Sequence, residues 1–526
     1  MWKLCKKYDK YKWNKDKTKN TGFHLSGELK SSYNCENIRT FCSIYDIILM
    51  VIKLFKIKFT DDIIVNETGL AMIGKLLNDT RFRVNINNKS KLKNTSELMP
   101  NYDIMAAYIG CLAQAKPEFV RVEEYRKDMF FKNAMMLDKK VPSECIVRQR
   151  LDAIGKEDMG EFKRIVARTN VELLTNSRVK LTSRYKELIP VDIDVSPHDN
   201  SNTKKEGVEY TYKGYFGYAP IYAYIGNEGY LLNWELREGK EHSQCSKTIP
   251  FLKDTIEMAK EIIKGNNVLF TLDSGHSCTE NIELFENENV KYIIKKNNQK
   301  DRLQDIFEEA KKRYNEEQES KEKLTEKEIE QYKGTVNKVV TRDGKEYYIT
   351  SVEKIKYLKN NEGKETATKV RVVRECIKRT IDKKGQVLIA PEYEIKQYYT
   401  NLDNEVTDEE VIELYHKHAI CEQFHSEIKS DMDLERLPSG KFNTNEIVLK
   451  LAQLTFNILR MIGQANVELH KDGLNIQRKR IRTVIKDIVY FASRIVKHAR
   501  KEYISISKKE FFKDTFHSLF NYFCYE

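Results

Sequence analysis

The sequence predicts an α/β protein in which a strand-rich segment interrupts a core of strands and helices, with helical regions before and after it. Three observations support this fold class. At Pro190 the hydrophobic pattern changes from a helical repeat to alternation. The short apolar run Val268–Leu272 ends in an aspartate. Residues 335–400 then alternate again, over a length that fits several strands.

Length and charge limit the classes of protein that need to be considered. A chain of 526 residues can bury several cores, and 91 Lys and Arg against 79 Asp and Glu favour a polyanionic partner. The ten cysteines form no Cys-x-x-Cys pair, which argues against a zinc site or a disulfide framework. Residues 1–20 lack the apolar core of a secretory signal, and the run Ile47–Phe55 is far shorter than the roughly 20 residues that span a bilayer. We therefore expect a cytoplasmic protein with no membrane partner.

The first two regions precede the core. Residues 1–98 have no legible role and end in the polar run 85–96, which we interpret as a linker. Residues 99–184 follow a helical pattern, in which Ser143 fits a helix start and Arg148 and Arg150 lie beside apolar positions. This pattern is typical of a DNA-binding domain, and equally of a helix hairpin with a solvated basic face.

Residues 185–300 are predicted to form the first part of the core. The segment Val191–Val195 alternates so that Asp192 and Asp194 share one strand face. Asp273 directly follows the apolar run described above, at the end of another strand. The remaining predicted elements are strands within 215–226, 230–238 and 290–294 and a helix over 249–264.

The later regions are predicted from charge and periodicity. Residues 301–397 combine a charged helix with the strand-rich insertion, and the core resumes over 398–465 with an acidic helix start at Asp408. Residues 466–526 are predicted to be basic and helical, because 471–509 hold twelve Lys or Arg and three Asp or Glu among apolar residues. Arg478, Arg480 and Arg482 are candidate DNA contacts in this region, although a solvated surface would show the same pattern.

A polar stripe marks the helix that follows the insertion. Tyr415, His418, Glu422, His425 and Lys429 are separated by three or four residues, so they lie along one helix face. Taken alone, such a stripe is more often a surface with ordinary ion pairs than a functional site.

The same residues resemble a known family. Tyr-x2-Arg-x3-Glu-x6-Lys is the signature of the insertion-sequence-four superfamily of bacterial DDE transposases, and this chain reads Tyr415-x2-His418-x3-Glu422-x6-Lys429. Residues 431–442, DMDLERLPSGKF, are similar to the thirteen-eighty branch of these insertion-sequence transposases. Segments 147–152, 191–194, 272–275 and 480–483 are similar to that branch too, so the resemblance runs from residue 60 to the C-terminal end. The chain departs from the signature at His418, which offers no guanidinium fork to a phosphate.

The resemblance implies a fold, a metal site and a reaction. It implies an RNase H-like core in which Asp194, Asp273 and Glu422 hold two Mg²⁺ ions, with Mn²⁺ able to substitute. Asp192 stays an alternative to Asp194, because the two aspartates point to one strand face. Carboxylate oxygens suit hard Mg²⁺, and two such ions can activate the attacking oxygen and stabilise the leaving one.

Cut-and-paste transposition is the activity that this family carries out. The resemblance implies an endonuclease step at the element ends, followed by strand transfer into target DNA, with the enzyme as a dimer on its terminal inverted repeats. Tyr415 and Lys429 would contact phosphate, and His418 would occupy the place of the third contact. Two rival functions remain: an RNase H-like nuclease that cuts without joining, and a catalytically silent DNA-binding protein derived from a transposase.

Overall fold

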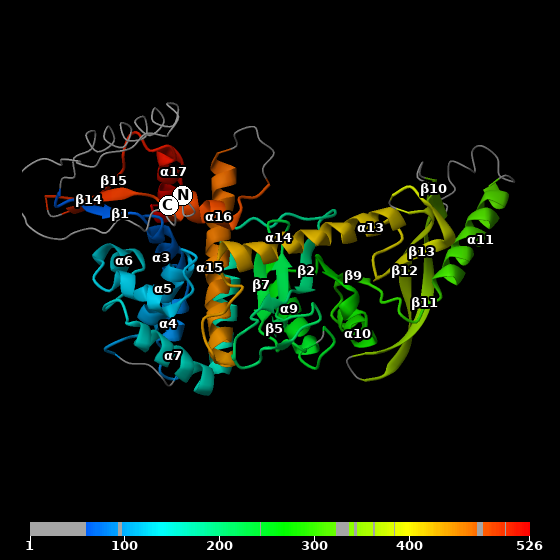
Figure 1. Ribbon diagram of the computed structural model, residues 1–526, viewed down its shortest axis with the longest axis horizontal. Coiled ribbons are helices and arrows are strands. Elements are labelled where there is room, and N and C mark those ends of the chain that lie inside the picture. Colours follow the sequence, from blue (N-terminus) through cyan, green and yellow to red (C-terminus); the bar gives the residue numbers. More distant parts are fainter. Residues whose placement is uncertain are drawn as a thin grey trace, which may run out of the picture. The chain divides into compact units, whose positions relative to one another are not determined.

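The computed structural model describes residues 59–92, 97–241, 243–321, 336–340, 345–360, 363–382, 384–470, 477–499 and 501–525 (Figure 1). Within 336–340 only the backbone is described. The chain divides into two compact units, residues 1–62 and 63–526, and the elements below belong to the second. The predicted region 1–98 therefore lies mostly outside the described residues. None of the helices in the described ranges is long and apolar enough to cross a membrane.

A nine-stranded mixed sheet organises the described fold, in the order β10-β11-β12-β13-β9-β8-β2-β6-β7. This confirms the α/β prediction. Its core strands are β2 (Ile189–Val195), β6 (Ile221–Ile225), β7 (Tyr230–Glu235), β8 (Val268–Leu272) and β9 (Lys291–Lys295). The small strands β3 (His198–Asp199), β4 (Glu209–Tyr210) and β5 (Phe216–Tyr218) form a separate sheet.

The core of the sheet combines antiparallel and parallel neighbours. β2, β6 and β7 pair antiparallel, whereas β2, β8 and β9 are parallel neighbours. Parallel pairing requires a crossover, and helices provide it. These helices are α9 (Thr248–Ile263) before β8 and α10 (Thr279–Asn287) before β9. The carboxyl ends of β2 and β8 therefore meet at one edge of the sheet.

The strand-rich segment extends this sheet. Its long strands are β11 (Lys345–Lys359), β12 (Glu365–Ile381) and β13 (Val387–Thr400), preceded by β10 (Val336–Val340). The end of β13 pairs with β9, so the segment continues the core sheet. The charged helix α11 (Leu303–Lys321) packs on these strands through the buried Phe307 and Ala310.

A helical group packs around the long helix α15 (Phe442–Leu469), which is buried along most of its length. Ser143 caps α7 (Glu144–Glu157), as predicted, by accepting a hydrogen bond from the backbone N–H of Ile146. The group shares one apolar core with the central sheet. Its other members are α3 (Leu70–Asn78), α4 (Phe82–Ile86), α5 (Asn101–Leu112), η1 (Phe119–Tyr125), α6 (Met129–Ala134), α7 (Glu144–Glu157) and α8 (Met159–Leu174).

The C-terminal region differs from the predicted set of basic helices. Within it, β14 (Ser493–His498) and β15 (Lys501–Ser505) form an antiparallel hairpin that β1 (Ile63–Val65) joins. The β-branched pair Ile495 and Val496 favours extended backbone, and pairing with a distant strand outweighs the helical spacing of the charges. Among the described residues after α15, the helical elements are α16 (Ile481–Val484), the π-helical turn η5 (Ile485–Val489) and α17 (Lys513–Cys524).

The helix that carries the polar stripe is a series of short segments. It begins at α13 (Asp408–His416), whose N-terminal Thr407 and Glu410 form a capping box. The chain continues through η3 (Lys417–Ile420), α14 (Cys421–Ser426) and the π-helical turn η4 (Glu427–Asp431). Figure 1 shows α13 and α14 in yellow as a nearly continuous rod that crosses the green core strands.

Candidate active site

Asp194 and Asp273 lie at the ends of two neighbouring parallel strands. Ile193 of β2 is in register with Leu272 of β8, and the next residue in each strand direction is an aspartate. Burial raises the pKa of Tyr212, and the negative charges of Asp194 and Asp273 raise it further, so both carboxylates act on one hydroxyl. The topology thus brings together two of the three carboxylates that the sequence singled out.

Asp194 is held by a histidine from α14. His425 Nε2 lies 3.1 Å from Asp194 Oδ2, and the hydroxyl oxygen of Tyr224 on β6 lies 3.0 Å from His425 Nδ1. Burial raises the pKa of Asp194, but the hydrogen bond from His425 outweighs it, and the net pKa is below its usual value. Burial lowers the pKa of His425 itself. At neutral pH the pair is therefore a carboxylate beside a neutral imidazole.

Asp273 has an equivalent partner in the turn that follows β8. His276 Nδ1 lies 2.8 Å from Asp273 Oδ1, which also accepts a hydrogen bond from the backbone N–H of Gly275 at 3.0 Å. The His276 side chain is fully buried, whereas the Asp273 side chain is 41% exposed. A buried ring thus holds a carboxylate that remains open to solvent.

Glu422 joins this edge of the sheet from α14. It lines a cavity of about 450 Å³ with Asp194, whereas Asp273 does not line that cavity. Within the described part of the chain, the side chain of Glu422 forms no hydrogen bond or ion pair. Its carboxylate is therefore available to a ligand. The other residues that line the cavity are Val195, Ser196, Tyr212, Lys213, His425, Ser426, Lys429, Ser430 and Glu435.

Asp192, the alternative first carboxylate, is already occupied. Arg184 donates to both of its oxygens, at 2.8 and 2.6 Å, and His418 Nδ1 lies 3.1 Å from Oδ1. The Asp192 side chain is 1% exposed and that of Arg184 is 2% exposed. Burial raises the pKa of Asp192, but the charge of Arg184 outweighs it and holds the net pKa well below the usual value. Asp192 is therefore the anionic half of a buried ion pair.

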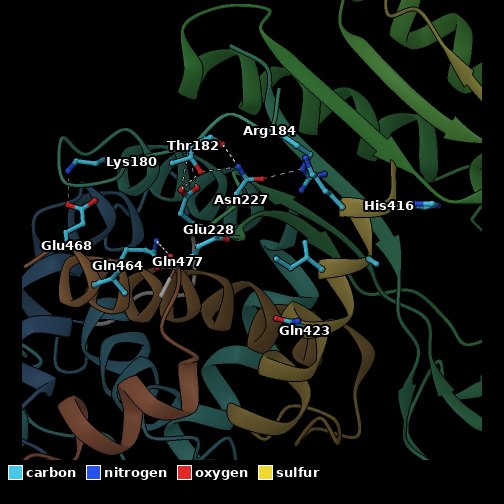
Figure 2. A pocket seen from close by; sticks show the side chains of 14 residues that line it. Lys180, Thr182, Arg184, Asn227, Glu228, His416, Gln423, Gln464, Glu468 and Gln477 are labelled. Carbon is cyan, nitrogen blue, oxygen red and sulfur yellow. Dashed lines mark hydrogen bonds and ion pairs between the residues drawn. The ribbon is translucent and has the colours of Figure 1, made fainter. Parts of the chain in front are cut away.

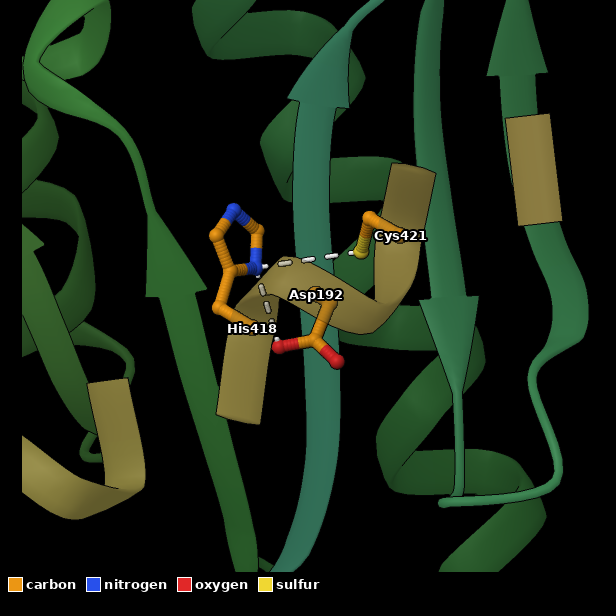
Figure 3. A group of neighbouring side chains, drawn as sticks. All are labelled: Asp192, His418 and Cys421. Atoms are coloured by element: carbon orange, nitrogen blue, oxygen red, sulfur yellow. Dashed lines mark hydrogen bonds and ion pairs between the residues drawn. The ribbon is translucent and has the colours of Figure 1, made fainter. Parts of the chain in front are cut away.

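Figure 3 shows Asp192, His418 and Cys421 converging between β2 and the helix above it. Their potential ligand atoms lie within 4.8 Å of one another, the one such group among the described residues. Imidazole and thiolate suit softer metals than Mg²⁺. Moreover, a cation placed here would face the guanidinium of Arg184 on the same carboxylate. The group therefore does not fit a hard divalent ion.

The remaining signature residues take different positions. Tyr415 packs on Tyr398, with ring centroids 4.7 Å apart, and the His418 side chain is 10% exposed. Burial lowers the pKa of His418, but the hydrogen bond and charge of Asp192 outweigh it and the net pKa is raised. Lys429 lines the cavity and donates to the backbone oxygen of Pro197. Of the predicted phosphate contacts in the signature, Lys429 thus has the most direct access to the cavity.

The basic residues singled out in the sequence are engaged to different degrees. Arg148 is exposed and pairs with Glu144, whereas Arg150 donates to Asn101 and is half-buried. The second group lies beside the signature helix. There Arg478 pairs with the buried Glu427, Arg480 holds Asp431 at 2.7 and 3.0 Å, and the side chain of Arg482 is exposed.

A larger cavity of about 850 Å³ lies beside another face of the same helix (Figure 2). It is lined by Arg184, Asn227 and Gln423, among other polar side chains. Figure 2 shows Asn227 and Glu228 on the turn between β6 and β7, pointing toward the segment that holds Thr182. Gln423 thus faces this second cavity, while its neighbour Glu422 faces the first.

Sequence reasoning assigned no role to three residues that shape this site. His425 was recognised only as a member of the polar stripe, and its three-residue step from Glu422 was the available signal. His276 lies three residues after Asp273 in a polar turn, and this spacing alone did not indicate a contact. Tyr224 carries no signal in the sequence, because its contact with His425 spans 201 positions.

Comparison with known proteins places these features in a context. The profile of the family described as transposase DDE domain group 1 matches residues 53–524. A search of curated protein sequences finds no match. Among solved structures, the chain is similar to a piggyBac transposase in a synaptic complex with hairpin DNA, at 9% identity and a TM-score of 0.36. That match covers 81% of this chain and 80% of the other.

Proposed function

This chain belongs to the transposase DDE domain group 1 family, and we propose that it cuts phosphodiester bonds at the ends of a mobile element and joins the freed DNA ends to target DNA. The single observation that carries the proposal is the edge where β2 and β8 end. There Asp194 and Asp273 directly follow Ile193 and Leu272, the last residues paired between the two strands, and Glu422 lines the same cavity as Asp194. We infer further that the core is RNase H-like and that the chain falls in the insertion-sequence-four superfamily, thirteen-eighty branch.

The donor set fits a hard divalent cation. All three candidate ligands are carboxylates, and none forms an ion pair with a Lys or Arg in the described part of the chain. Such uncompensated negative charge suits Mg²⁺ or Mn²⁺, which prefer oxygen ligands. We propose that Asp194, Asp273 and Glu422 hold two Mg²⁺ ions. When bound, such ions activate an attacking oxygen and stabilise the leaving one.

The geometry supports Asp194 over Asp192 as the first ligand. Arg184 holds both Asp192 oxygens, so releasing them would leave a buried guanidinium without its partner. The Asp194 side chain is 25% exposed and lines the cavity that Glu422 also lines. Asp194 can therefore bind a cation without breaking a buried ion pair.

Side chains around the cavity have roles in holding the DNA substrate. Lys429 and Lys213 line the wall beside the carboxylates, where they can bind phosphate oxygens of a strand that enters the cavity. Tyr415 is proposed as a further contact. Because the His418 ring lies against Asp192, a phosphate contact by His418 would have to coexist with that hydrogen bond. We propose double-stranded DNA as the partner, with two copies of the chain in the complex.

A cleavage and joining assay tests the proposed function. Full-length protein is incubated with a labelled duplex that carries the end of the element and with an unlabelled target duplex, in Mg²⁺ or in EDTA. We expect Mg²⁺-dependent nicking at the element end and a slower-migrating joined product. Nicking without joining would support the nuclease alternative, and binding without nicking would support the catalytically silent one.

A further inference from the structure

A chain of two hydrogen bonds leads from the interior of the sheet to Asp194. The hydroxyl of Tyr224 lies 3.0 Å from Nδ1 of His425, and Nε2 of the same ring lies 3.1 Å from Asp194 Oδ2. Tyr224 is 1% exposed and His425 is 5% exposed. Water therefore has little access to either ring, and the hydrogen bonds are made within the protein.

The chemistry of the three groups fixes the direction of both hydrogen bonds. A carboxylate only accepts, so Nε2 of His425 must carry a proton to bond with Asp194. In the neutral imidazole Nδ1 is then the acceptor, and the hydroxyl of Tyr224 is the donor that it requires. Tyr224 thus selects the tautomer of His425 that can donate to Asp194.

The placement of His425 on α14 links two elements of the site. Glu422 lies three residues earlier on the same helix and lines the cavity with Asp194 and His425. His425 therefore connects the helix that carries one carboxylate to the strand that carries another. Asp194 Oδ1 accepts a hydrogen bond from the backbone N–H of Val195 at 2.8 Å, so His425 supplies the contact that holds the other oxygen, Oδ2. A loss of this contact would release Oδ2 and would also remove one link between the helix and β2.

We propose that His425, oriented by Tyr224, is a positioning residue for Asp194 and fixes the carboxylate in the orientation that binds a divalent cation. This inference rests on the proposed function of the site. Groups that orient metal ligands in this way typically contribute about 10–100-fold to metal affinity or activity. His425 itself is not assigned as a ligand.

The strand β6 offers a matched control. Tyr222 lies two residues before Tyr224, is equally buried, and bonds with Nε2 of His198 instead of His425. Tyr222→Phe and Tyr224→Phe therefore each remove one buried hydroxyl from the same strand. Only the second removes the donor that selects the His425 tautomer.

The first experiment measures Mn²⁺ binding to the full-length protein by calorimetry, without DNA. We expect His425→Phe to weaken binding by about 10–100-fold. Tyr224→Phe should weaken it less, His425→Gln should keep part of the affinity because its amide can still donate, and Tyr222→Phe should bind as the wild type does. Wild-type affinity in both His425→Phe and Tyr224→Phe would overturn the proposal.

A second readout does not depend on metal. Nitrogen-15 NMR of the histidine-labelled, metal-free protein, with the His425 signals identified by their loss in His425→Gln, should show a neutral ring protonated at Nε2. A ring protonated at Nδ1 alone would overturn the proposal. Asp194→Ala separates this inference from the proposed function. If it abolishes Mn²⁺ binding while His425→Phe does not, the positioning role alone fails. If Asp194→Ala also binds normally, the metal site itself is wrong.

Discussion

Asp192 and Asp194 lie two residues apart on one strand, and only their contacts in the folded protein distinguish them. Strand periodicity places Asp192 and Asp194 on the same face, so the sequence left both as candidates. Their partners separate them: Arg184 and His418 hold Asp192, whereas Asp194 is held by His425 and lines the cavity. Arg184 lies in an irregular segment before the strand, and no sequence pattern indicates that it folds back onto Asp192.

The first prediction concerns this buried ion pair. Asp192→Ala should lower the free energy of unfolding by about 3–5 kcal/mol, because it leaves the Arg184 guanidinium buried without a counter-charge. Chemical denaturation measures the loss. The double variant Asp192→Leu with Arg184→Met should recover much of it, since it removes both charges. A single variant as stable as the wild type would contradict the account.

The second prediction concerns His198, which is fully buried and bonds with the backbone oxygen of Leu434 at 3.0 Å and with Tyr222. Burial lowers its pKa well below the usual 6.5. Below pH 6.5 the unfolded chain therefore binds a proton on this ring that the folded protein does not bind. The contribution of the neutral ring to the free energy of unfolding is complete above pH 6.5 and is lost as the pH falls toward the folded-state pKa.

Urea denaturation at pH 7.5 and 5.5 tests it. The wild type should lose more stability between these pH values than His198→Gln, which cannot titrate. The raised pKa of His418 contributes with the opposite sign, because a proton gained on folding stabilises at low pH, so the difference between the two proteins is the relevant quantity. Equal losses in both would show that His198 does not titrate as described.

At the scale of elements, the helix after the strand-rich segment connects the signature to the sheet. Helical periodicity predicted that His418, Glu422 and His425 share a face, and in the structure the two histidines reach β2. The sequence did not predict that this face turns toward the strand as well as toward a cavity, because which surface a polar stripe meets depends on the tertiary arrangement. It also did not predict the division of the helix into α-helical, 3₁₀ and π-helical segments.

The third prediction concerns the contact between this helix and the turn before β7. Gly229 has φ of +71°, and a Cβ built there would lie 2.2 Å from the ring of Phe424 on α14. Gly229→Ala should therefore displace α14 and slow DNA cleavage. Gly214 is the matched control, because its φ of +86° is equally unfavourable for alanine but its Cβ would meet nothing closer than 3.6 Å.

Cleavage rate and thermal stability are measured for both variants. Backbone strain alone costs about 1–2 kcal/mol in each, since alanine is disfavoured in the left-handed region. Only Gly229→Ala should lose activity beyond what its stability explains. A Gly229→Ala protein with wild-type cleavage would show that the position of Phe424 does not affect the site.

The fourth prediction concerns the basic residues beside the helix. Arg480 donates two hydrogen bonds to the Asp431 carboxylate. Arg482 is exposed, and its side chain forms no hydrogen bond or ion pair with the described residues. Arg482→Ala should reduce the slope of DNA affinity against salt by about one counterion, and Arg480→Ala should reduce it less and destabilise the protein more. Affinities at several salt concentrations decide between them. Equal slopes for Arg482→Ala and the wild type would remove Arg482 from the DNA interface.

Across the whole molecule, the sequence predicted the elements that a local pattern defines and missed those that depend on contacts between distant segments. The run Val268–Leu272 was predicted with the bounds that β8 has. A short, almost wholly apolar run that ends in a polar turn is typical of a parallel strand buried on both faces. The hairpin of β14 and β15 was missed although its own pairing is local, because the charges of this region follow a helical spacing and the third strand, β1, lies more than 400 positions away. The division into six regions remains a prediction.

The most direct test of the account is the rate of a single round of DNA cleavage in Mg²⁺ by Asp194→Asn and by Glu435→Gln. Both replace one carboxylate on the wall of the same cavity with an amide of similar size. We expect Asp194→Asn to cleave no faster than the EDTA control while it folds and binds DNA as the wild type does, and Glu435→Gln to remain active. Wild-type cleavage by Asp194→Asn would contradict the account.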